Sequence, residues 1–168
     1  MDNLIGLLRI RVRRGINLVG RDSVTSSDPY VTVSNGEQTV KTRVVKNSIN
    51  PEWNDELTLP IKDINDPLVL SVYDKDTFTE DDKMGDAEIG IKPYTECLRK
   101  GLQDLSDNTT VERVQPNEKN CLARESSVIW NKGKMFQDMH LKLRNVEKGE
   151  VEIQIELIDL PGCKTVWI

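Results

Sequence analysis

Several residue types that stabilise or anchor large classes of protein are scarce in this sequence. Aromatic residues make up 5% of its 168 residues, and there is one histidine. No apolar run approaches the roughly 20 residues that a membrane-spanning helix requires. The three cysteines, Cys97, Cys121 and Cys163, are odd in number and widely spaced. They therefore predict reduced thiols rather than a disulfide framework or a CxxC metal site.

A surplus of basic charge is also missing, since the formal net charge is −5. A general nucleic-acid-binding protein carries a basic surplus, so the charge predicts no nucleic-acid partner. The first residues lack the apolar segment and the small-residue cleavage site of a signal peptide. A chain of this length is enough for one hydrophobic core. We therefore expect a single-domain intracellular protein.

No combination of residues predicts an enzyme active site. The sole histidine, His140, lies between Met139 and Leu141 in an alternating segment, which is typical of a surface position on a strand. The chain contains no G-x-S-x-G motif, phosphate-binding loop or zinc-ligand spacing. We expect a binding protein without catalytic residues.

The sequence does contain a series of short segments in which apolar and polar residues alternate or β-branched residues cluster. Such segments are typical of strands, and alternation with period two indicates one buried face. The predicted strands are 8–13, 30–33, 39–45, 56–59, 68–73, 87–91, 111–114, 127–130, 139–143 and 151–157. Asn35-Gly36 between two of them indicates a hairpin, because both residues tolerate positive φ. The pattern predicts an all-β fold, an antiparallel β-sandwich.

The strand pattern is interrupted over residues 92–134, which we interpret as a small insertion within one domain spanning 1–168. Tyr94, Leu98 and Leu102 follow helical spacing and predict a short amphipathic helix over 94–104. The apolar side of this helix either packs on the sandwich or forms a surface for a partner protein. Spacing alone does not decide between these alternatives.

Crowded carboxylates follow the predicted strand 68–73. They are Asp74, Asp76, Asp81 and Asp82. Acids this close repel one another unless water or a cation neutralises them, and loop 20–28 is expected to bring further acids to the same end of the sandwich. Carboxylate oxygens suit Ca²⁺, which takes about six to eight oxygen ligands. The alternative is a solvated acidic loop. An EF-hand is excluded, because its required glycine would fall on Thr79.

Three segments carry a resemblance to a known family: SSDPYVTV, KTRVVKNSINPEWNDEL and VYDKDTFTEDDKMGDAEI. Together they resemble the C2 domain, a Ca²⁺- and phospholipid-binding β-sandwich, over residues 6–91 and again in the last strands. The segments LLRIRVRRGINLV, NCLARES and LKLRNVEKGEVEIQIE are similar to those of the plant C2-domain abscisic-acid-related family. The resemblance implies an antiparallel sandwich of C2 type, with type II topology, that carries the helix-containing insertion.

The resemblance also implies a set of calcium ligands at the loop tips. Five side chains and two main-chain oxygens match the ligand positions of the family: Asp22, Asp28, Asp74, Asp76 and Asp82, with the carbonyls of Arg21 and Lys75. Such a set would hold two Ca²⁺ ions, which take the formal net charge from −5 to −1. Asp81 lies one residue from the pattern, so we interpret it as a surface acid.

Two apolar and three basic residues are candidates for lipid contact. Phe78 and Val24 occupy loop positions where C2 domains present apolar side chains to the bilayer. The alternative for Phe78 is packing against the end of the sandwich. Lys41, Arg43 and Lys46 form either a polybasic phosphoinositide site or a solvated edge.

The family resemblance implies a function as well. We expect a Ca²⁺-dependent phospholipid-binding adaptor that transiently recruits partner proteins, abscisic-acid receptors of the PYR/PYL type, to the plasma membrane. Two alternatives stay open: activation of an Obg-like GTPase or ATPase through protein contacts, and a Ca²⁺-insensitive interaction module. The partner surface would include Tyr94, Leu98 and Leu102. The expected locations are the cytosolic face of the plasma membrane, the cytoplasm and the nucleus.

Overall fold

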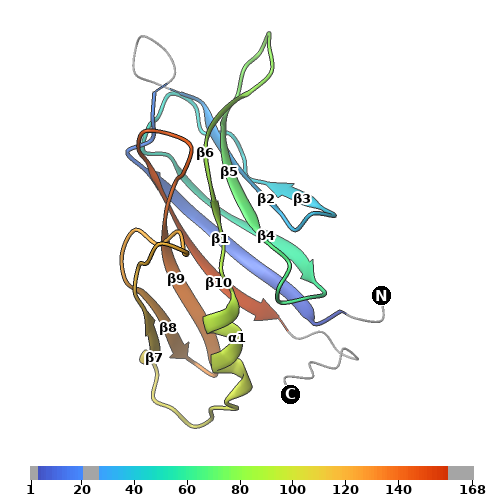
Figure 1. The fold of residues 1–168 in the computed structure, drawn as a ribbon, viewed down its shortest axis with the longest axis vertical. Helices are drawn as coiled ribbons and strands as arrows, with labels where there is room; N and C mark the ends of the chain where they lie inside the picture. Colours follow the sequence, from blue (N-terminus) through green and yellow to red (C-terminus); the bar gives the residue numbers. More distant parts are fainter. Residues whose placement is uncertain (1–3, 21–26, 159–168) are drawn as a thin grey trace.

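The computed structural model describes residues 4–20 and 27–158. Within them the chain forms strands joined by turns, with one helix after the sixth strand (Figure 1). The elements are β1 (Gly6–Ile16), β2 (Pro29–Ser34), β3 (Thr39–Lys41), β4 (Glu52–Ile61), β5 (Val69–Asp74), β6 (Asp82–Glu88), α1 (Lys92–Arg99), β7 (Thr109–Val114), β8 (Ser126–Asn131), β9 (Lys134–Lys142) and β10 (Glu150–Ile158). No helix in these residues is long and apolar enough to cross a membrane.

The strands form two antiparallel sheets. One has six strands in the order β4-β1-β10-β9-β8-β7, and the other has four in the order β3-β2-β5-β6. Their inner faces share one hydrophobic cluster, to which Leu8, Ile10 and Val12 of β1 contribute from the first sheet and Val31 and Val33 of β2 from the second. The alternation of buried and half-buried residues along β1 and β2 is what the period-two pattern predicts. The predicted antiparallel β-sandwich is confirmed.

Two predicted boundaries near the acidic end are wrong. The strand expected over 39–45 ends at Lys41, because the Thr42 hydroxyl accepts the Val31 N–H at 3.0 Å and the Arg43 N–H turns to the Asp55 carboxylate at 2.8 Å. These side-chain acceptors interrupt the regular ladder. Two backbone hydrogen bonds still join this segment to β2, from the Thr42 N–H to the Val31 carbonyl at 2.9 Å and from the Val45 N–H to the Pro29 carbonyl at 3.1 Å. The loop expected after Asp74 is shorter than predicted, since β6 already begins at Asp82.

The segment interpreted as an insertion adds two strands to the larger sheet. β7 pairs with β8, and β8 pairs with β9, so this segment extends the sheet that β1 and β10 begin. Helix α1 lies at the end of the sandwich beside these strands (Figure 1). It starts with Pro93 in its first turn and ends at Arg99, not near 104. Gly101, at φ +61°, follows the last turn in the left-handed conformation typical of a helix terminus.

Tyr94 belongs to the core, which corrects its prediction as part of a partner surface. Its side chain is 1% exposed. The hydroxyl donates a hydrogen bond to the Met135 carbonyl at 2.7 Å and accepts one from the Leu157 N–H at 2.9 Å. One side chain of α1 thereby ties β9 to β10 through backbone groups, which holds the helix against the sandwich.

We expect Tyr94→Phe to lower the free energy of unfolding by about 2 kcal/mol, because two shielded backbone groups lose their hydrogen-bond partner. Urea unfolding followed by circular dichroism measures this change. Tyr73→Phe is the matched control, since the Tyr73 ring stacks on Tyr30 with centroids 5.7 Å apart and that contact survives the substitution. Equal effects of the two substitutions would contradict this role of the Tyr94 hydroxyl.

Candidate functional site

The start of β2 and the end of β5 bring two of the predicted ligand residues together. Pro29 is the antiparallel partner of Asp74, so Asp28 lies beside that carboxylate. The Asp28 N–H donates to Asp74 Oδ1 at 2.8 Å, and the Lys75 N–H donates to the Asp28 carbonyl at 2.9 Å. Asp28 Oδ1 also accepts the Asn47 N–H at 2.9 Å. Backbone pairing thus holds together two residues, Asp28 and Asp74, that are distant in sequence.

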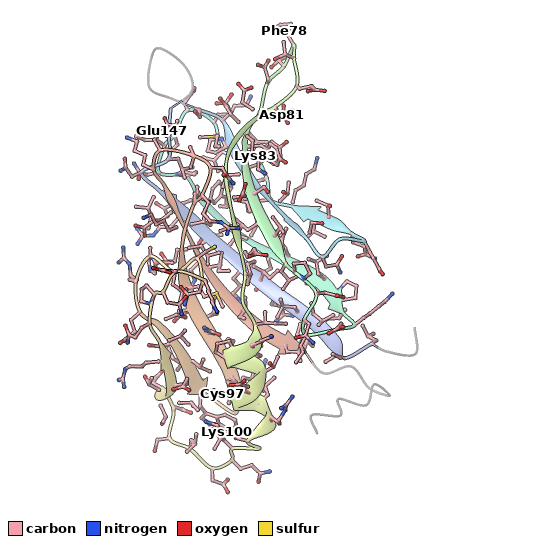
Figure 2. All side chains as sticks on the ribbon, in the orientation of Figure 1. Phe78, Asp81, Lys83, Cys97, Lys100 and Glu147 are labelled. Carbon is pink, nitrogen blue, oxygen red and sulfur yellow. The ribbon has the colours of Figure 1, made fainter. Side chains whose placement is uncertain are left out.

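Asp76 shapes the loop between β5 and β6. Its Oδ1 accepts the N–H groups of Phe78 at 3.0 Å and Thr79 at 3.3 Å, which is the geometry of an Asx turn. These hydrogen bonds hold the pKa of Asp76 below its usual range, and the bond from the Phe78 N–H has the largest effect. Figure 2 shows the consequence, with Phe78 at the tip of the loop. The Phe78 side chain is 93% exposed, so the alternative that it packs against the sandwich is excluded.

Asp81 is bound inside the loop, and the interpretation of it as a surface acid is wrong. Its carboxylate accepts hydrogen bonds from the Asp76 N–H at 2.8 Å and from the Tyr30 hydroxyl, and its side chain is only 18% exposed. The bond from the Asp76 N–H, followed by that from Tyr30, lowers the pKa of Asp81. Burial, with the hydrogen bond to Asp81, raises the pKa of Tyr30 to about 12. Asp82, the predicted ligand, is exposed and is the cross-strand partner of Asp74.

The calcium ligand set suits the chemistry of the ion but is not assembled within the described residues alone. Arg21, Asp22 and Val24 lie outside them. In residues 4–20 and 27–158, no group of three or more His, Cys, Asp or Glu side chains could hold a metal ion. The carboxylates of Asp28 and Asp74 are hard oxygen donors at one end of the sandwich, as Ca²⁺ prefers. The predicted ligands Arg21 and Asp22 lie outside the described residues, so the full predicted set is not seen together.

The three basic residues differ in their surroundings. The Arg43 guanidinium binds Asp55 through Nη2 at 2.8 Å and Nε at 3.0 Å, which lowers the pKa of Asp55 and compensates the charge of Arg43. Lys41 Nζ lies over the Tyr30 ring, 6.0 Å from its centroid. Lys46 is exposed. The basic surface is thus made mainly by Lys41 and Lys46.

The helix end of the molecule carries a half-buried apolar surface. Leu98 and Leu102 are partly exposed and pack against the core, and Leu98 lines a hollow of about 330 Å³ together with Trp130. Leu98 and Leu102 therefore stay available for contact with a partner, unlike Tyr94. In Figure 2 the labelled Cys97 and Lys100 of this region lie at the opposite end of the molecule from Phe78.

His140 and the cysteines show no catalytic arrangement in the described part of the chain. His140 is half-buried on β9, with Nδ1 3.9 Å from Glu150 Oε1, and burial lowers its pKa. Cys97 and Cys121 are free thiols, as predicted, and the structure shows that both are buried. Burial raises the pKa of Cys97. Cys163 lies outside the described residues. Both described thiols are core groups rather than exposed nucleophiles.

Known proteins resemble this chain over nearly its whole length. The model of the C2 domain family matches residues 6–107. Protein C2-DOMAIN ABA-RELATED 8 of Arabidopsis thaliana is 61% identical over 162 residues, which cover 96% of this chain and 98% of that protein. GTPase activating protein 1 of Oryza sativa subsp. japonica is 52% identical over 166 residues, which cover 99% of each chain.

Solved structures share the fold. The paired C2 domains of Extended-Synaptotagmin 2, calcium bound, align with a TM-score of 0.63 at 21% identity over 94% of this chain and 47% of that one. A single C2 domain of plant Extended Synaptotagmin 1 aligns with a TM-score of 0.61 at 20% identity over 94% of this chain and 98% of that one. At these identities the likeness shows the fold alone. The sequence matches show more: this chain belongs to the C2 domain family, among the C2-domain ABA-related proteins.

Proposed function

We propose that this protein is a Ca²⁺-dependent phospholipid-binding adaptor that brings protein partners to an anionic membrane. One observation carries the proposal: Phe78, the one large apolar side chain that is highly exposed among the described residues, lies at the tip of an acidic loop. An aromatic side chain presented alone to solvent gains free energy by entering a bilayer. The acids around it make that entry dependent on a cation.

The charge of the loop supplies the dependence on calcium. Residues 74–83 carry five carboxylates and two lysines, a net charge of −3, which repels an anionic lipid surface. Bound Ca²⁺ would reverse this charge and offer open coordination positions to lipid phosphate. We propose two ions, held by the side chains and main-chain oxygens that match the family: Asp22, Asp28, Asp74, Asp76 and Asp82, with Arg21 and Lys75. Val24 would enter the bilayer beside Phe78, and Lys41 and Lys46 would contact phosphoinositide head groups.

Vesicle co-sedimentation tests the membrane function. The full chain is mixed with anionic and with neutral vesicles, in Ca²⁺ or in chelator. Pelleting with anionic vesicles that occurs in Ca²⁺ but not in chelator supports the adaptor function. Equal pelleting in Ca²⁺ and in chelator would instead indicate a Ca²⁺-insensitive module, and the proposed mechanism would be wrong.

We expect Phe78→Ser to weaken Ca²⁺-dependent vesicle binding about tenfold or more, because burial of a Phe side chain contributes about 1.5–3 kcal/mol. Phe78→Trp is the matched control and keeps the affinity, since an indole also enters the interface. Calcium binding measured without lipid stays unchanged in both variants. Full vesicle affinity of Phe78→Ser would show that the tip does not enter the bilayer.

The helix end is the proposed partner surface. Helix α1, which contains Leu98 and precedes Leu102, lies at the other end of the molecule from Phe78 (Figures 1 and 2), so a protein bound there would face away from the membrane. The names of the Arabidopsis relatives favour partners in abscisic-acid signalling, and we propose receptors of the PYR/PYL type. The protein would act at the cytosolic face of the plasma membrane, exchanging with the cytoplasm and the nucleus. Co-sedimentation of a receptor with vesicles only when this protein is present tests the recruitment.

A second candidate function is activation of a nucleotide hydrolase. The rice relative at 52% identity is named GTPase activating protein 1. An Obg-like GTPase or ATPase would be the partner, and this chain would act through protein contacts. Turnover by that enzyme with and without this protein is the test, and an unchanged rate removes this function.

A further inference from the structure

We propose that Asp81 is a positioning residue for calcium binding. Its carboxylate, held by the Tyr30 hydroxyl, fixes the peptide unit between Lys75 and Asp76 and so orients the Lys75 carbonyl, a predicted main-chain ligand, for the ion. This inference rests on the proposed function, because it concerns the same site. It assigns a role to Asp81, which lies one residue from the ligand pattern of the family.

Both carboxylate oxygens of Asp81 are occupied by donors of the protein itself. Oδ1 accepts the Asp76 N–H at 2.8 Å, and Oδ2 accepts the Tyr30 hydroxyl. Lys75 Nζ lies 3.9 Å from Oδ2 and compensates part of the negative charge. Coordination of Ca²⁺ by Asp81 would compete with these hydrogen bonds, and a part-buried donor that loses its acceptor is unfavourable. The surroundings therefore favour a role through the Asp76 N–H over a role as a ligand.

The hydrogen bond from the Asp76 N–H sets the direction of the Lys75 carbonyl. The two groups belong to one peptide unit, which is planar and trans, so its N–H and its C=O point in opposite directions. Because the N–H is bound to Asp81, the Lys75 carbonyl oxygen faces away from that carboxylate. The negative charge beside the N–H also polarises the peptide unit, which makes the carbonyl oxygen a stronger ligand for a cation.

The peptide unit before Lys75 is held as well. The Lys75 N–H donates to the Asp28 carbonyl at 2.9 Å, and the Asp28 N–H donates in turn to Asp74 Oδ1 at 2.8 Å. The two peptide units that flank the Lys75 Cα are thus fixed, one by the residue before β2 and the other by Asp81. The backbone of Lys75 therefore needs little further ordering when an ion binds, which favours binding.

Tyr30 connects Asp81 to the rigid part of the smaller sheet. Its backbone is paired with that of Tyr73 in β5, and the two rings stack with centroids 5.7 Å apart. Trp53 Nε1 donates to the Pro29 carbonyl at 3.0 Å, which holds the start of β2 against β4. The Tyr30 hydroxyl therefore has a fixed position, and it restrains Asp81 at the base of the acidic loop (Figure 2).

Two substitutions of equal charge test these hydrogen bonds in the full chain. Asp81→Asn and Asp81→Ala both remove one negative charge, but asparagine can accept the Asp76 N–H with its oxygen and donate to the Tyr30 hydroxyl with its nitrogen. Calorimetry without lipid measures Ca²⁺ affinity. We expect it to stay within about threefold in Asp81→Asn and to fall about tenfold or more in Asp81→Ala. Equal affinity of the two variants, whether high or low, would overturn the proposal.

Tyr30→Phe tests the anchor without a change of charge. It removes one donor to Asp81, and we expect Ca²⁺ affinity to fall about threefold to tenfold. In the Asp81→Ala background it has no further effect, because the hydroxyl has already lost its acceptor there. Tyr73→Phe, at the stacked neighbour, is the matched control and keeps the affinity. The same loss from Tyr30→Phe in both backgrounds would show that Tyr30 does not act through Asp81.

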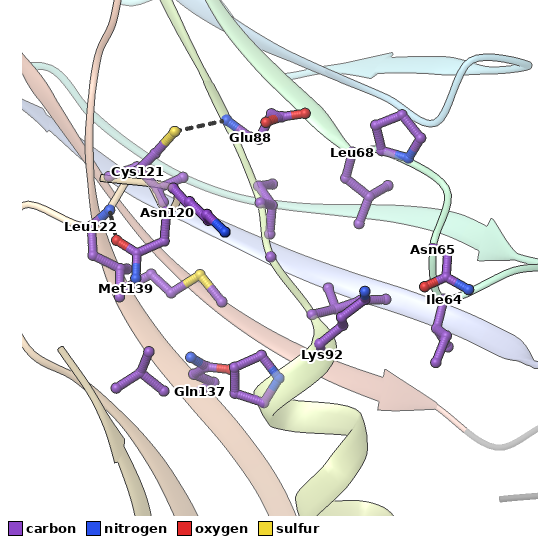
Figure 3. A pocket seen from close by; sticks show the side chains of 18 of the residues that line it. Ile64, Asn65, Leu68, Glu88, Lys92, Asn120, Cys121, Leu122, Gln137 and Met139 are labelled. Carbon is purple, nitrogen blue, oxygen red and sulfur yellow. Dashed lines mark hydrogen bonds between the residues drawn. The ribbon is translucent and has the colours of Figure 1, made fainter. Parts of the chain in front are cut away.

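Amide hydrogen exchange in the Ca²⁺-free protein gives a readout that needs no ion. We expect the Asp76 amide to exchange at least about fivefold faster in Asp81→Ala than in Asp81→Asn, because only asparagine leaves it an acceptor. The amides of β1 are the internal reference. Glu88→Ala is the charge-matched control at the other end of β6, where the exposed Glu88 donates its N–H to Cys121 Sγ at 3.4 Å (Figure 3). It leaves Asp76 exchange and Ca²⁺ affinity unchanged.

The outcomes separate this proposal from the proposed function. If the unchanged protein binds Ca²⁺ and the Asp76 amide exchanges equally in Asp81→Ala and Asp81→Asn, the positioning role is wrong and the calcium-dependent function stands. If the unchanged protein binds no Ca²⁺, both are wrong. Circular dichroism verifies that each variant is folded.

Discussion

Asp74→Asn is expected to abolish Ca²⁺-dependent binding to anionic vesicles, with an apparent affinity at least about 100-fold lower. Asp74 is the predicted calcium ligand at the point where β5 pairs with the start of β2. An amide oxygen is a weaker, uncharged donor to a hard cation. Asparagine keeps the oxygen that accepts the Asp28 N–H, so the pairing of β2 with β5 remains. Co-sedimentation measures lipid binding, and circular dichroism verifies the fold.

Asp104→Asn is the matched control for this substitution. It makes the same change of charge in an exposed turn after α1, and its φ of +58° suits asparagine. We expect vesicle binding of Asp104→Asn to equal that of the unchanged protein. Equal losses of vesicle binding in both variants would mean that binding depends on the total charge of the protein and not on a ligand at position 74. Retained binding of Asp74→Asn would remove Asp74 from the calcium site.

Gly85→Ala is expected to lower the free energy of unfolding by about 3 kcal/mol or more. Gly85 has a φ of +117°, where an L side chain is strained, and an added Cβ would lie 2.7 Å from Val146 Cγ1 and 2.9 Å from Leu143 Cβ. The neighbouring backbone has little room to move, since the Asp86 N–H donates to the Arg144 carbonyl at 3.1 Å and the Asp86 carbonyl accepts the Arg144 N–H at 2.7 Å. Strain and overpacking therefore add to each other.

Gly36→Ala separates these two causes. Gly36 also has a positive φ, +94°, but nothing lies within 4 Å of an added Cβ. We expect it to cost about 1 kcal/mol from backbone conformation alone. Urea unfolding of both variants gives the difference, which measures the close approach of β6 to the turn at residues 143–146. Equal losses would contradict that close approach.

The connection around Gly85 matters for the candidate site because it holds the base of the acidic loop. Asp86 is buried, and burial opposes its charge, but the hydrogen bonds from Lys83 and Asn145 outweigh burial and lower its pKa. Lys83 Nζ lies 2.9 Å from Asp86 Oδ2. The strand that begins at Asp82 is thus anchored to the β9–β10 turn, and the loop carrying Phe78 extends from a rigid base.

Local signals in the sequence predicted most of the strands, since the period of burial is a property of the strand itself. Residues 8–13 alternate in the sequence and alternate in burial within β1. The end of α1 also had a local signal, because Gly101 is a typical residue after a helix terminus. The prediction extended the helix beyond Gly101 because Leu102 follows helical spacing. In the structure Leu102 lies after the helix and still contacts the core.

The roles of individual acids had no comparable local signal. Asp81 and Asp82 are adjacent and chemically identical. Asp81 nevertheless accepts a hydrogen bond from the Tyr30 hydroxyl, whereas Asp82 is exposed. The difference depends on Tyr30, which is distant in sequence and reaches the loop only because β2 pairs with β5. The surroundings of Arg43 also had no local signal. Its charge is compensated by Asp55 of β4, and nothing in the residues next to Arg43 predicts that pairing.

The sequence by itself determined that this protein is an antiparallel β-sandwich with an acidic loop, because alternation and motif spacing are carried by neighbouring residues. Only the tertiary structure decided that Phe78 is exposed and that Tyr94 is a core residue. Each of these depends on contacts between segments far apart in the chain. Their geometry follows from sheet pairing and packing, which no single segment specifies.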